Sequence, residues 1–331
     1  IIQNFYKLEK YKNKNKLIFL SKRKNSININ INRLFENDFK VIENYNFLSI
    51  YYWMARSPIV GISRIKEAKN SNIFFQKKCY QFYNSNINLN WEFFINDISN
   101  KKIYKNLNPQ NKKFIIWKPR FRGSFNLRNT SFSSFEKLFL YLEKKGFLIM
   151  SFAAKHPNFQ SKNYIKLNSI LSKDNLDKFS FFLDYYSSYI ISGDSGGYVP
   201  ALILNKPLLH YDIAPPCPVF KGAKRCLCLT KKIRDKRDNK YMSFEKMSQL
   251  NFDKLKGNKK LKELINFQEN FFIENNTQQD LLLAFIELEE KVNLGLNIFE
   301  LDDYKINQFY GNNIPKNHYN PNGKVQIADS F

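Results

Sequence analysis

Cysteine and histidine are scarce in this chain of 331 residues. It has four cysteines, and the pair Cys226-x-Cys228 lacks a second pair at zinc-ligand spacing. So few cysteines exclude a disulfide-stapled secreted scaffold and favour a reducing, cytoplasmic environment. The three histidines, His156, His210 and His318, do not stand at metal-ligand spacing, and no carboxylates join them in a recognisable pattern. The sequence therefore predicts no metal site.

Long apolar runs are also missing. No stretch of about 18 residues is free of charged or polar interruption, so we expect neither a transmembrane helix nor a signal peptide within the sequence. Any membrane contact is expected to be peripheral, at the inner face of the cell membrane. The sequence opens on Ile1 rather than Met, so a first strand or a targeting segment can be missing from the N-terminal part.

Acidic residues are outnumbered by basic ones, with a formal net charge of +24. Such a field usually points to nucleic acid or an anionic membrane surface. Here the excess is mostly Lys and accompanies abundant Asn, Ile and Phe, so an A/T-rich genome explains much of it and nucleic acid is the less favoured partner. Arginine, which binds phosphate in a bidentate fashion, carries more information where it clusters. The clusters are Arg120, Arg122 and Arg128, and Arg225, Arg234 and Arg237.

The length predicts two lobes. Residues 1–112 are rich in Lys and Asn, with apolar strand candidates at 17–20 and 39–42 and an amphipathic helix at 47–55. An Asn- and Lys-dominated segment, 84–109, is expected to contain the route between the lobes. Residues 113–295 form the predicted C-terminal lobe, and residues 296–331 a tail that crosses back to the first lobe.

From Phe114 onward, short apolar runs alternate with helical periodicity, which is typical of an α/β domain with a parallel sheet. The expected strands are 114–117, 147–152, 189–191 and 207–210. Three of the expected helices begin at capping residues, namely Ser133-x-x-Glu136, Asp174 and Thr277-x-x-Asp280. A short helix is expected over 199–204.

The most informative segment is Gly193-Asp194-Ser195-Gly196-Gly197, between an expected strand and that short helix. A glycine turn at the carboxyl end of a parallel strand can present backbone N–H groups to a diphosphate. The alternative is a tight turn whose glycines serve only local geometry. Arg120 and the pair Arg128-Asn129 follow the first strand of this lobe, where guanidinium groups can meet phosphates. His210 is expected to end a strand facing the same crevice, although a lone histidine is more often structural.

The glycine segment also resembles the nucleophile loop of trypsin-like serine proteases, and Ala153-Ala154-Lys155-His156 resembles their histidine segment. The spacing speaks against this interpretation. Only about forty residues separate the two segments, with strong helical periodicity between them, whereas a double β-barrel needs well over a hundred.

The order of several short segments resembles a family of bacterial glycosyltransferases of surface-polysaccharide and lipopolysaccharide biosynthesis. The C-terminal half of that family looks like the nucleotide-sugar-binding lobe of GT-B enzymes. The resemblance covers about 114–292. It is carried by the strand at Phe114, Leu127-Arg128-Asn129-Thr130-Ser131-Phe132, Lys145-Gly146-Phe147, 189–196, Asn205-Lys206-Pro207-Leu208, Met242-Ser243-Phe244-Glu245 and Glu274-Asn275-Asn276-Thr277. It departs from the family where Ser151-Phe152-Ala153 replaces an Arg-Met-Gly-like turn and where Tyr211-Asp212 stands in place of a usual Asn.

The resemblance implies two Rossmann-like lobes and metal-independent transfer of a sugar to a glycan or lipid-linked acceptor. The nucleotide-sugar is then a co-substrate, and no cofactor is implied. Ser195 and Gly196 would lie beside the donor diphosphate, Arg128 and Asn129 would line the cleft, and Arg120 would lie nearby. Asp194, Gly197 and His210 complete the expected donor site. The N-terminal lobe matches too weakly to name a catalytic residue.

A noncatalytic protein is the alternative. In that case a basic α/β domain binds nucleic acid or an anionic surface, and the sheet is only a scaffold. A steep salt dependence of binding distinguishes this alternative from the transferase.

Overall fold

The computed structural model describes residues 17–19, 40–42, 90–121, 129–153, 159–213, 225–242 and 268–296. The chain divides into two compact units, residues 1–104 with 173–185 and residues 105–172 with 186–331. The helix expected at 47–55 and the tail beyond residue 296 lie outside the described residues.

In the first unit, β1 (Leu17–Phe19) pairs in parallel with β2 (Lys40–Ile42), which confirms both expected strands. Helices α4 (Glu92–Ile95) and α5 (Ile98–Leu107) lie in the segment that was expected to contain the route between the lobes, and the boundary between the two units, after residue 104, falls within that segment. Helix α5 continues past the boundary between the units. Helix α8 (Lys173–Tyr186) also belongs to the described part of this unit, and Asp174 lies within its first turn rather than before it.

Aromatic packing explains why an Asn- and Lys-rich segment is helical here. Phe94 of α4 is fully buried and its ring lies 4.7 Å from that of Phe181 on α8. Asp97 accepts a hydrogen bond from the backbone N–H of Asn100 at 2.8 Å, at the start of α5, and it also pairs with Lys178 of α8. A few buried rings and one capping carboxylate outweigh the polar composition of the rest.

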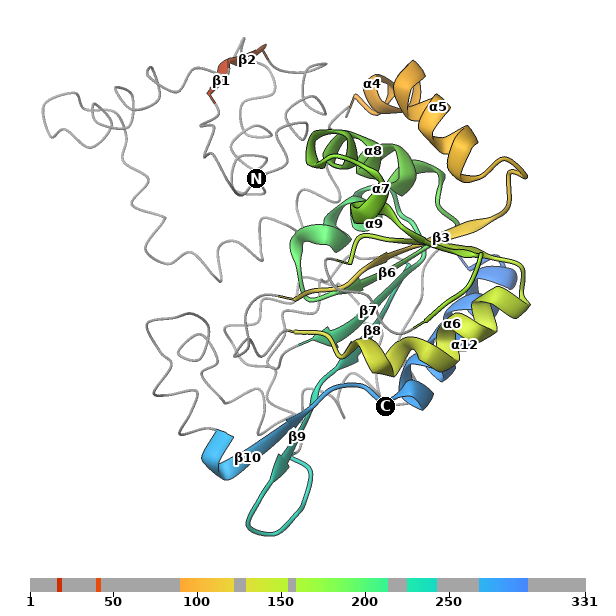
Figure 1. Ribbon diagram of the computed structural model, residues 1–331. Helices are drawn as coiled ribbons and strands as arrows, with labels where there is room; N and C mark the ends of the chain where they lie inside the picture. The colour runs from red at the N-terminus through yellow and green to blue at the C-terminus, as the bar shows by residue number, and fades with distance from the viewer. Residues whose placement is uncertain are drawn as a thin grey trace, which may run out of the picture. The chain divides into compact units, whose positions relative to one another are not determined.

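The second unit is built on a six-stranded parallel sheet of order β5-β4-β3-β6-β7-β8 (Figure 1). Numbered along the chain, the order is 3-2-1-4-5-6, which is that of doubly wound nucleotide-binding sheets. The strands are β3 (Phe114–Lys118), β4 (Leu148–Ser151), β5 (Tyr164–Lys166), β6 (Tyr189–Gly193), β7 (Leu208–Ile213) and β8 (Cys226–Thr230). The predicted α/β class with a parallel sheet is confirmed.

Five of these strands, all except β5, are buried along their whole length. Near-continuous apolar runs such as Phe114-Ile115-Ile116-Trp117 are what a parallel strand requires when both faces of its sheet are covered. Side chains on both faces of the sheet are therefore buried, each face under its own layer of packing.

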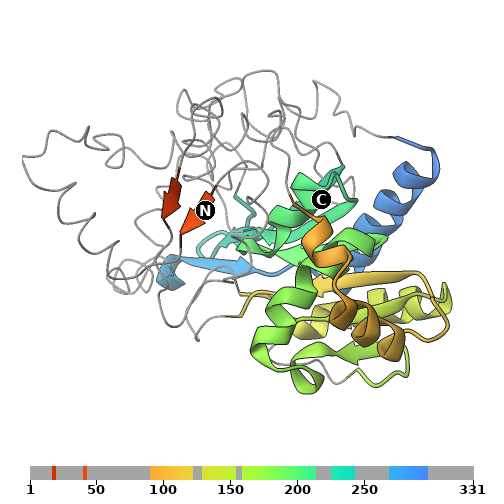
Figure 2. The ribbon, with the colours of Figure 1, turned by 90° about the horizontal axis from the view of Figure 1, so that it is seen from above.

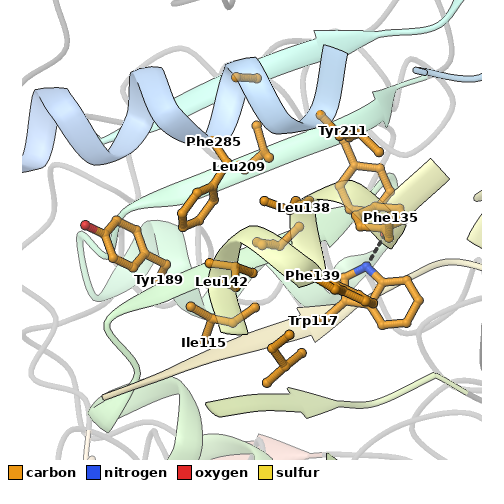
Figure 3. Close-up of a cluster of buried hydrophobic side chains, with 14 of the residues drawn as sticks. Ile115, Trp117, Phe135, Leu138, Phe139, Leu142, Tyr189, Leu209, Tyr211 and Phe285 are labelled. Atoms are coloured by element: carbon orange, nitrogen blue, oxygen red, sulfur yellow. Dashed lines mark hydrogen bonds between the residues drawn. The ribbon is translucent and has the colours of Figure 1, made fainter. Parts of the chain in front are cut away.

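One face is covered by α6 (Glu136–Lys144) and α12 (Gln278–Asn293), which lie side by side. Figure 2 shows α12, in blue, running alongside the sheet, where it contacts β7 and β8. Figure 3 shows the core that these helices enclose, and a dashed line marks the hydrogen bond from Trp117 Nε1 to the Tyr211 hydroxyl at 3.1 Å. The labelled core residues are Ile115, Trp117, Phe135, Leu138, Phe139, Leu142, Tyr189, Leu209, Tyr211 and Phe285.

Of the two expected capping boxes, the one at α12 forms and the one at α6 does not. At α12 the Thr277 side chain accepts the N–H of Asp280 and the Asp280 carboxylate accepts the N–H of Thr277, as predicted. At α6 no side-chain cap forms, because the chain enters through the 3-10 turn η3 (Phe132–Phe135). Residues three apart in such a turn share one side, and Phe132 and Phe135 both contact the Trp117 ring. Packing of these two rings replaces the predicted cap.

The remaining elements surround the sheet. The turn after β6 is η4 (Gly196–Tyr198), followed by the expected short helix α9 (Val199–Ile203). Strands β9 (Lys232–Asp235) and β10 (Phe271–Glu274) form a separate antiparallel pair, and α7 (Leu167–Ile170) follows β5. Within the described ranges, none of the helices has the length and apolar character needed to cross a membrane.

Candidate functional site

The strand order of the sheet reverses between β3 and β6, because β4 and β5 follow on one side and β7 and β8 on the other. In open parallel sheets, ligands bind outside the carboxyl ends of the strands at this reversal. The chain leaving β3 passes through Pro119 to Arg120, and the chain leaving β6 enters the Gly193–Gly197 turn. Both segments that sequence analysis singled out therefore start from the two strands at the reversal.

Gly193 allows these two segments to touch. A Cβ atom on Gly193 would lie 3.0 Å from Thr130 Oγ1 and 3.2 Å from the backbone N of Arg120. Thr130 holds Arg120 in place, because its Oγ1 accepts the Arg120 N–H at 3.2 Å and its own N–H donates to the Arg120 carbonyl at 2.9 Å. The Arg120 side chain is only 7% exposed. A guanidinium group is thus partly enclosed at the reversal.

The other two glycines of the turn have different surroundings. A Cβ on Gly197 would meet the Lys118 side chain at 3.1 Å, whereas a Cβ on Gly196 would meet no atom within 4 Å. Ser195 turns its hydroxyl inward to accept the Gly197 N–H at 3.2 Å. Gly193 and Gly197 therefore serve close packing, and Gly196 is the exposed glycine that leaves room for a ligand. Because η4 and α9 are short, with three and five residues, little helix dipole is added.

Alanine substitutions should separate these roles. We expect Gly193→Ala to lower the free energy of unfolding by about 1–3 kcal/mol, since the added methyl group presses on backbone and on Thr130. Gly196→Ala should change it by less than about 1 kcal/mol, because the methyl group enters open space. Urea unfolding of the two variants measures both values. Equal losses would contradict the assignment of Gly193 as a packing residue.

A second group of polar residues lies at the same edge of the sheet, around the carboxyl ends of β7 and β8. We call Asn129, Asp212, Lys231, Asn275 and Asn276 the edge cluster. Lys231 follows β8, is 3% exposed, and donates from Nζ to the Asn129 carbonyl at 2.6 Å and to the Asn275 side-chain oxygen. Three segments distant in sequence are therefore joined by one ammonium group.

Asp212 lies within a register shift of β7, at φ 51°, and is fully buried. Its backbone N–H donates to Asn276 Oδ1 and its carboxylate accepts the Asn276 N–H, both at 2.8 Å. Asn276 also donates from Nδ2 to the Thr230 carbonyl at 2.8 Å. Asparagine and aspartate tolerate the left-handed region better than most residues, which suits Asp212 to this position.

Burial shifts the pKa values of this pair toward the neutral forms. Loss of hydration raises the pKa of Asp212 from 3.8 to about 6, although Lys231 and backbone N–H groups of Asn276 and Ser131 oppose the rise. Loss of hydration likewise lowers the pKa of Lys231, against the attraction of Asp212 and Asp194. The edge cluster lies at the same edge of the sheet as the Gly193 turn, and groups with shifted pKa values are found at functional sites more often than elsewhere, so we include it in the candidate site.

His210 occupies a different place from the one expected. Strand β7 does not end at His210 but continues to Ile213, so that expectation is wrong. The His210 side chain is 1% exposed, and its ring lies 4.6 Å from that of Tyr198 of η4. The strand is longer because the apolar pattern continues through the buried Tyr211 to Ile213. His210 is therefore enclosed in the sheet, beside Cys228 of β8.

The other predicted site residues divide into two sets. Arg128 lies outside the described residues, as do Arg122 of the same arginine cluster and His156 of the alternative protease interpretation. The described ones all lie near the carboxyl edge, namely Arg120, Asn129, Asp194, Ser195, Gly196 and Gly197. Among the residues that the structure describes, no group of three His, Cys, Asp or Glu side chains could hold a metal ion.

Sequence analysis missed the functional interpretation of Asp212, Lys231 and Asn276. A usable signal was present, because Asp212 and Lys231 are charged residues at the ends of apolar runs, where parallel strands finish. Strand β8 (Cys226–Thr230) is not among the expected strands, because its two cysteines draw attention to metal-ligand spacing rather than to the apolar run that contains them.

Comparison of the chain with protein-family models, with curated proteins and with solved structures gives no match.

Proposed function

We propose that this protein is a glycosyltransferase that moves a sugar from a nucleotide-sugar donor to a glycan or lipid-linked acceptor in surface-polysaccharide synthesis. The observation that carries the proposal is the contact between the Gly193 turn and Arg120 at the reversal of a 3-2-1-4-5-6 sheet. This is the position where such sheets bind nucleotides. The choice of sugar transfer as the reaction comes from the resemblance of several short segments to the glycosyltransferase family.

In the proposed reaction the donor diphosphate is the leaving group, and negative charge grows on it as the glycosidic bond breaks. Fixed positive groups stabilise such a transition state more than the ground state. Arg120 supplies a guanidinium group, and the open Gly196 supplies backbone that a phosphate can approach. With these groups we expect the reaction to need no metal ion.

The proposal extends to the whole chain in a GT-B arrangement. Residues 113–295 bind the donor, residues 1–112 face the acceptor, and the tail from 296 returns to the first lobe. The protein then works in the cytoplasm, with peripheral contact at the inner face of the membrane. A lipid-linked acceptor would be met at that surface.

A thermal-shift panel of UDP-, GDP-, CMP-, ADP- and dTDP-sugars tests the proposal. One class should raise the melting temperature selectively, since a ligand at a hundredfold excess over Kd stabilises the native state by about 2.7 kcal/mol. Gly196→Val should abolish the shift while keeping the melting temperature without ligand, because its side chain fills the open space at the turn.

Two results would count against the transferase. The first is a wild-type protein that no nucleotide-sugar stabilises. The second is tight nucleic-acid binding with a steep salt slope, which is the property of the noncatalytic alternative.

A further inference from the structure

The burial of Lys231 is unfavourable in free energy. Removing an ammonium group from water carries a large desolvation penalty in proteins, even after relaxation. Its hydrogen bonds to the Asn129 carbonyl and the Asn275 amide oxygen need a donor but not a charge. Both acceptors are neutral oxygens, so the charge of Lys231 requires a separate explanation.

The explanation lies in two carboxylates on the neighbouring strands. The Lys231 N–H donates to the carbonyl of Ile213 at 2.9 Å, which places Lys231 beside the end of β7 that carries Asp212. Asp194 directly follows Gly193, which pairs with Tyr211 of the same strand, and both carboxylates attract the Lys231 ammonium group. Asp212 is fully buried, and Asp194 is half-buried beside Ser195 and Gly196. Without Lys231, these two carboxylates would offset much of the positive potential that Arg120 and Lys118 supply beside the turn, and a phosphate group approaching the open glycine would be attracted less strongly.

We propose that Lys231 is a positioning residue whose charge makes this edge of the sheet able to accept a phosphate group. It offsets Asp194 and Asp212, and it holds the Asn129 carbonyl at the end of the loop that follows β3. The inference deepens the proposed function, on which it rests only for the identity of the phosphate as the diphosphate of a nucleotide-sugar.

Isothermal titration of the full chain with inorganic pyrophosphate, at low salt, tests the inference. Lys231→Met should weaken pyrophosphate binding about tenfold or more, because low-dielectric surroundings strengthen the interaction of a phosphate with the remaining carboxylates. The matched control is Lys232→Met, which removes the same charge one residue later. Lys232 belongs to β9 and pairs with Asp280 at 3.5 Å, so its loss should change affinity less than about twofold.

A double variant separates charge from tethering. Lys231→Met leaves Asp212 buried without its cation, and that variant can lose stability for this reason alone. Lys231→Met combined with Asp212→Asn restores the charge balance but not the bond to Asn129. We expect the double variant to recover most of the pyrophosphate affinity, whereas a purely structural tether predicts no recovery.

Asp194→Asn gives a further measurement that leaves the buried cluster intact. It should tighten pyrophosphate binding by a few fold, because it removes the half-buried carboxylate beside the open glycine. Unchanged or weaker binding in Asp194→Asn would contradict the electrostatic role, as would wild-type affinity in Lys231→Met.

The results also separate this inference from the proposed function. A wild-type protein that binds pyrophosphate with the expected dependence on Lys231, but no nucleotide-sugar, keeps this inference and removes the transferase. A protein that binds a nucleotide-sugar and pyrophosphate equally well with and without Lys231 keeps the transferase and removes this inference. A wild-type protein that does not bind pyrophosphate overturns the inference directly.

Discussion

Replacing Asp212 with asparagine should remove a fall in stability that the wild-type protein shows as the pH rises from about 4 to about 6. The folded state holds the Asp212 proton up to a pKa of about 6, whereas the unfolded chain releases it near 3.8. Between these values the unfolded chain binds fewer protons than the folded one, so the free energy of unfolding decreases with rising pH. Below 3.8 the contribution is fully present, and above about 6 it is lost.

The expected size is large for one side chain. A rise in pKa from 3.8 to about 6 corresponds to about 3 kcal/mol lost at neutral pH. An asparagine side chain at this position would keep an oxygen acceptor for the Asn276 N–H and would tolerate the positive φ. Asp212→Asn should therefore be more stable than wild type at pH 7, by up to about 3 kcal/mol, and equally stable near pH 4.

Urea unfolding at a series of pH values between 4 and 7 measures this difference. Asp97→Asn is a useful control because its pKa is shifted the other way. Desolvation raises the pKa of Asp97, but hydrogen bonds from Lys178 and Asn100 prevail and lower it below 3.8. That variant should lose stability above pH 4 rather than gain it. Parallel pH curves for wild type and Asp212→Asn would show that Asp212 is ionised throughout this range.

Asn276→Ala should be strongly destabilising. Its side chain accepts the N–H of Asp212 and donates to the carbonyl of Thr230, and all three residues are buried. Alanine leaves both backbone groups without these bonds, at about 1–3 kcal/mol each, so we expect a loss of about 2–6 kcal/mol.

Urea unfolding gives this loss, and hydrogen exchange localises it. The Asp212 amide should lose its protection, because its hydrogen bond to Asn276 Oδ1 disappears. The control is Asn106→Ala on the exposed side of α5, which should change stability by less than about 0.5 kcal/mol. A loss of similar size in both variants would mean that Asn276 does not connect the ends of β7 and β8.

The sequence predicts the central strands of the fold well. The runs at Phe114, Leu148 and Tyr189 are apolar on both faces and are bounded by polar residues or glycine, as buried parallel strands are. The cap at Thr277 depends on residues three apart and can be read locally. Helices α4 and α5 could not be predicted from a local pattern, because the burial of Phe94 requires the Phe181 ring of α8, which is far along the chain.

The candidate site is predictable only in part, for a related reason. The turn at Gly193 is visible as a string of glycines after an apolar run, and the structure places it at the reversal of the sheet. The edge cluster depends on contacts between residues far apart, since Lys231 and Asn129 are 102 positions apart and Asp212 and Asn276 are 64 apart. Local patterns contain no information about such pairs. The same holds for the packing of Gly193 against Thr130.

Helix α12 is synthesised after all the other described elements of the fold. It covers β7 and β8, and its Glu289 accepts a hydrogen bond from Tyr141 of α6, 148 positions earlier in the chain. Before residues 278–293 have been synthesised, α12 is absent from the core cluster that contains Ile115, Leu142 and Leu209. The growing chain therefore leaves exposed the part of this sheet face that α12 covers until that helix emerges, and apolar surface exposed during folding favours aggregation.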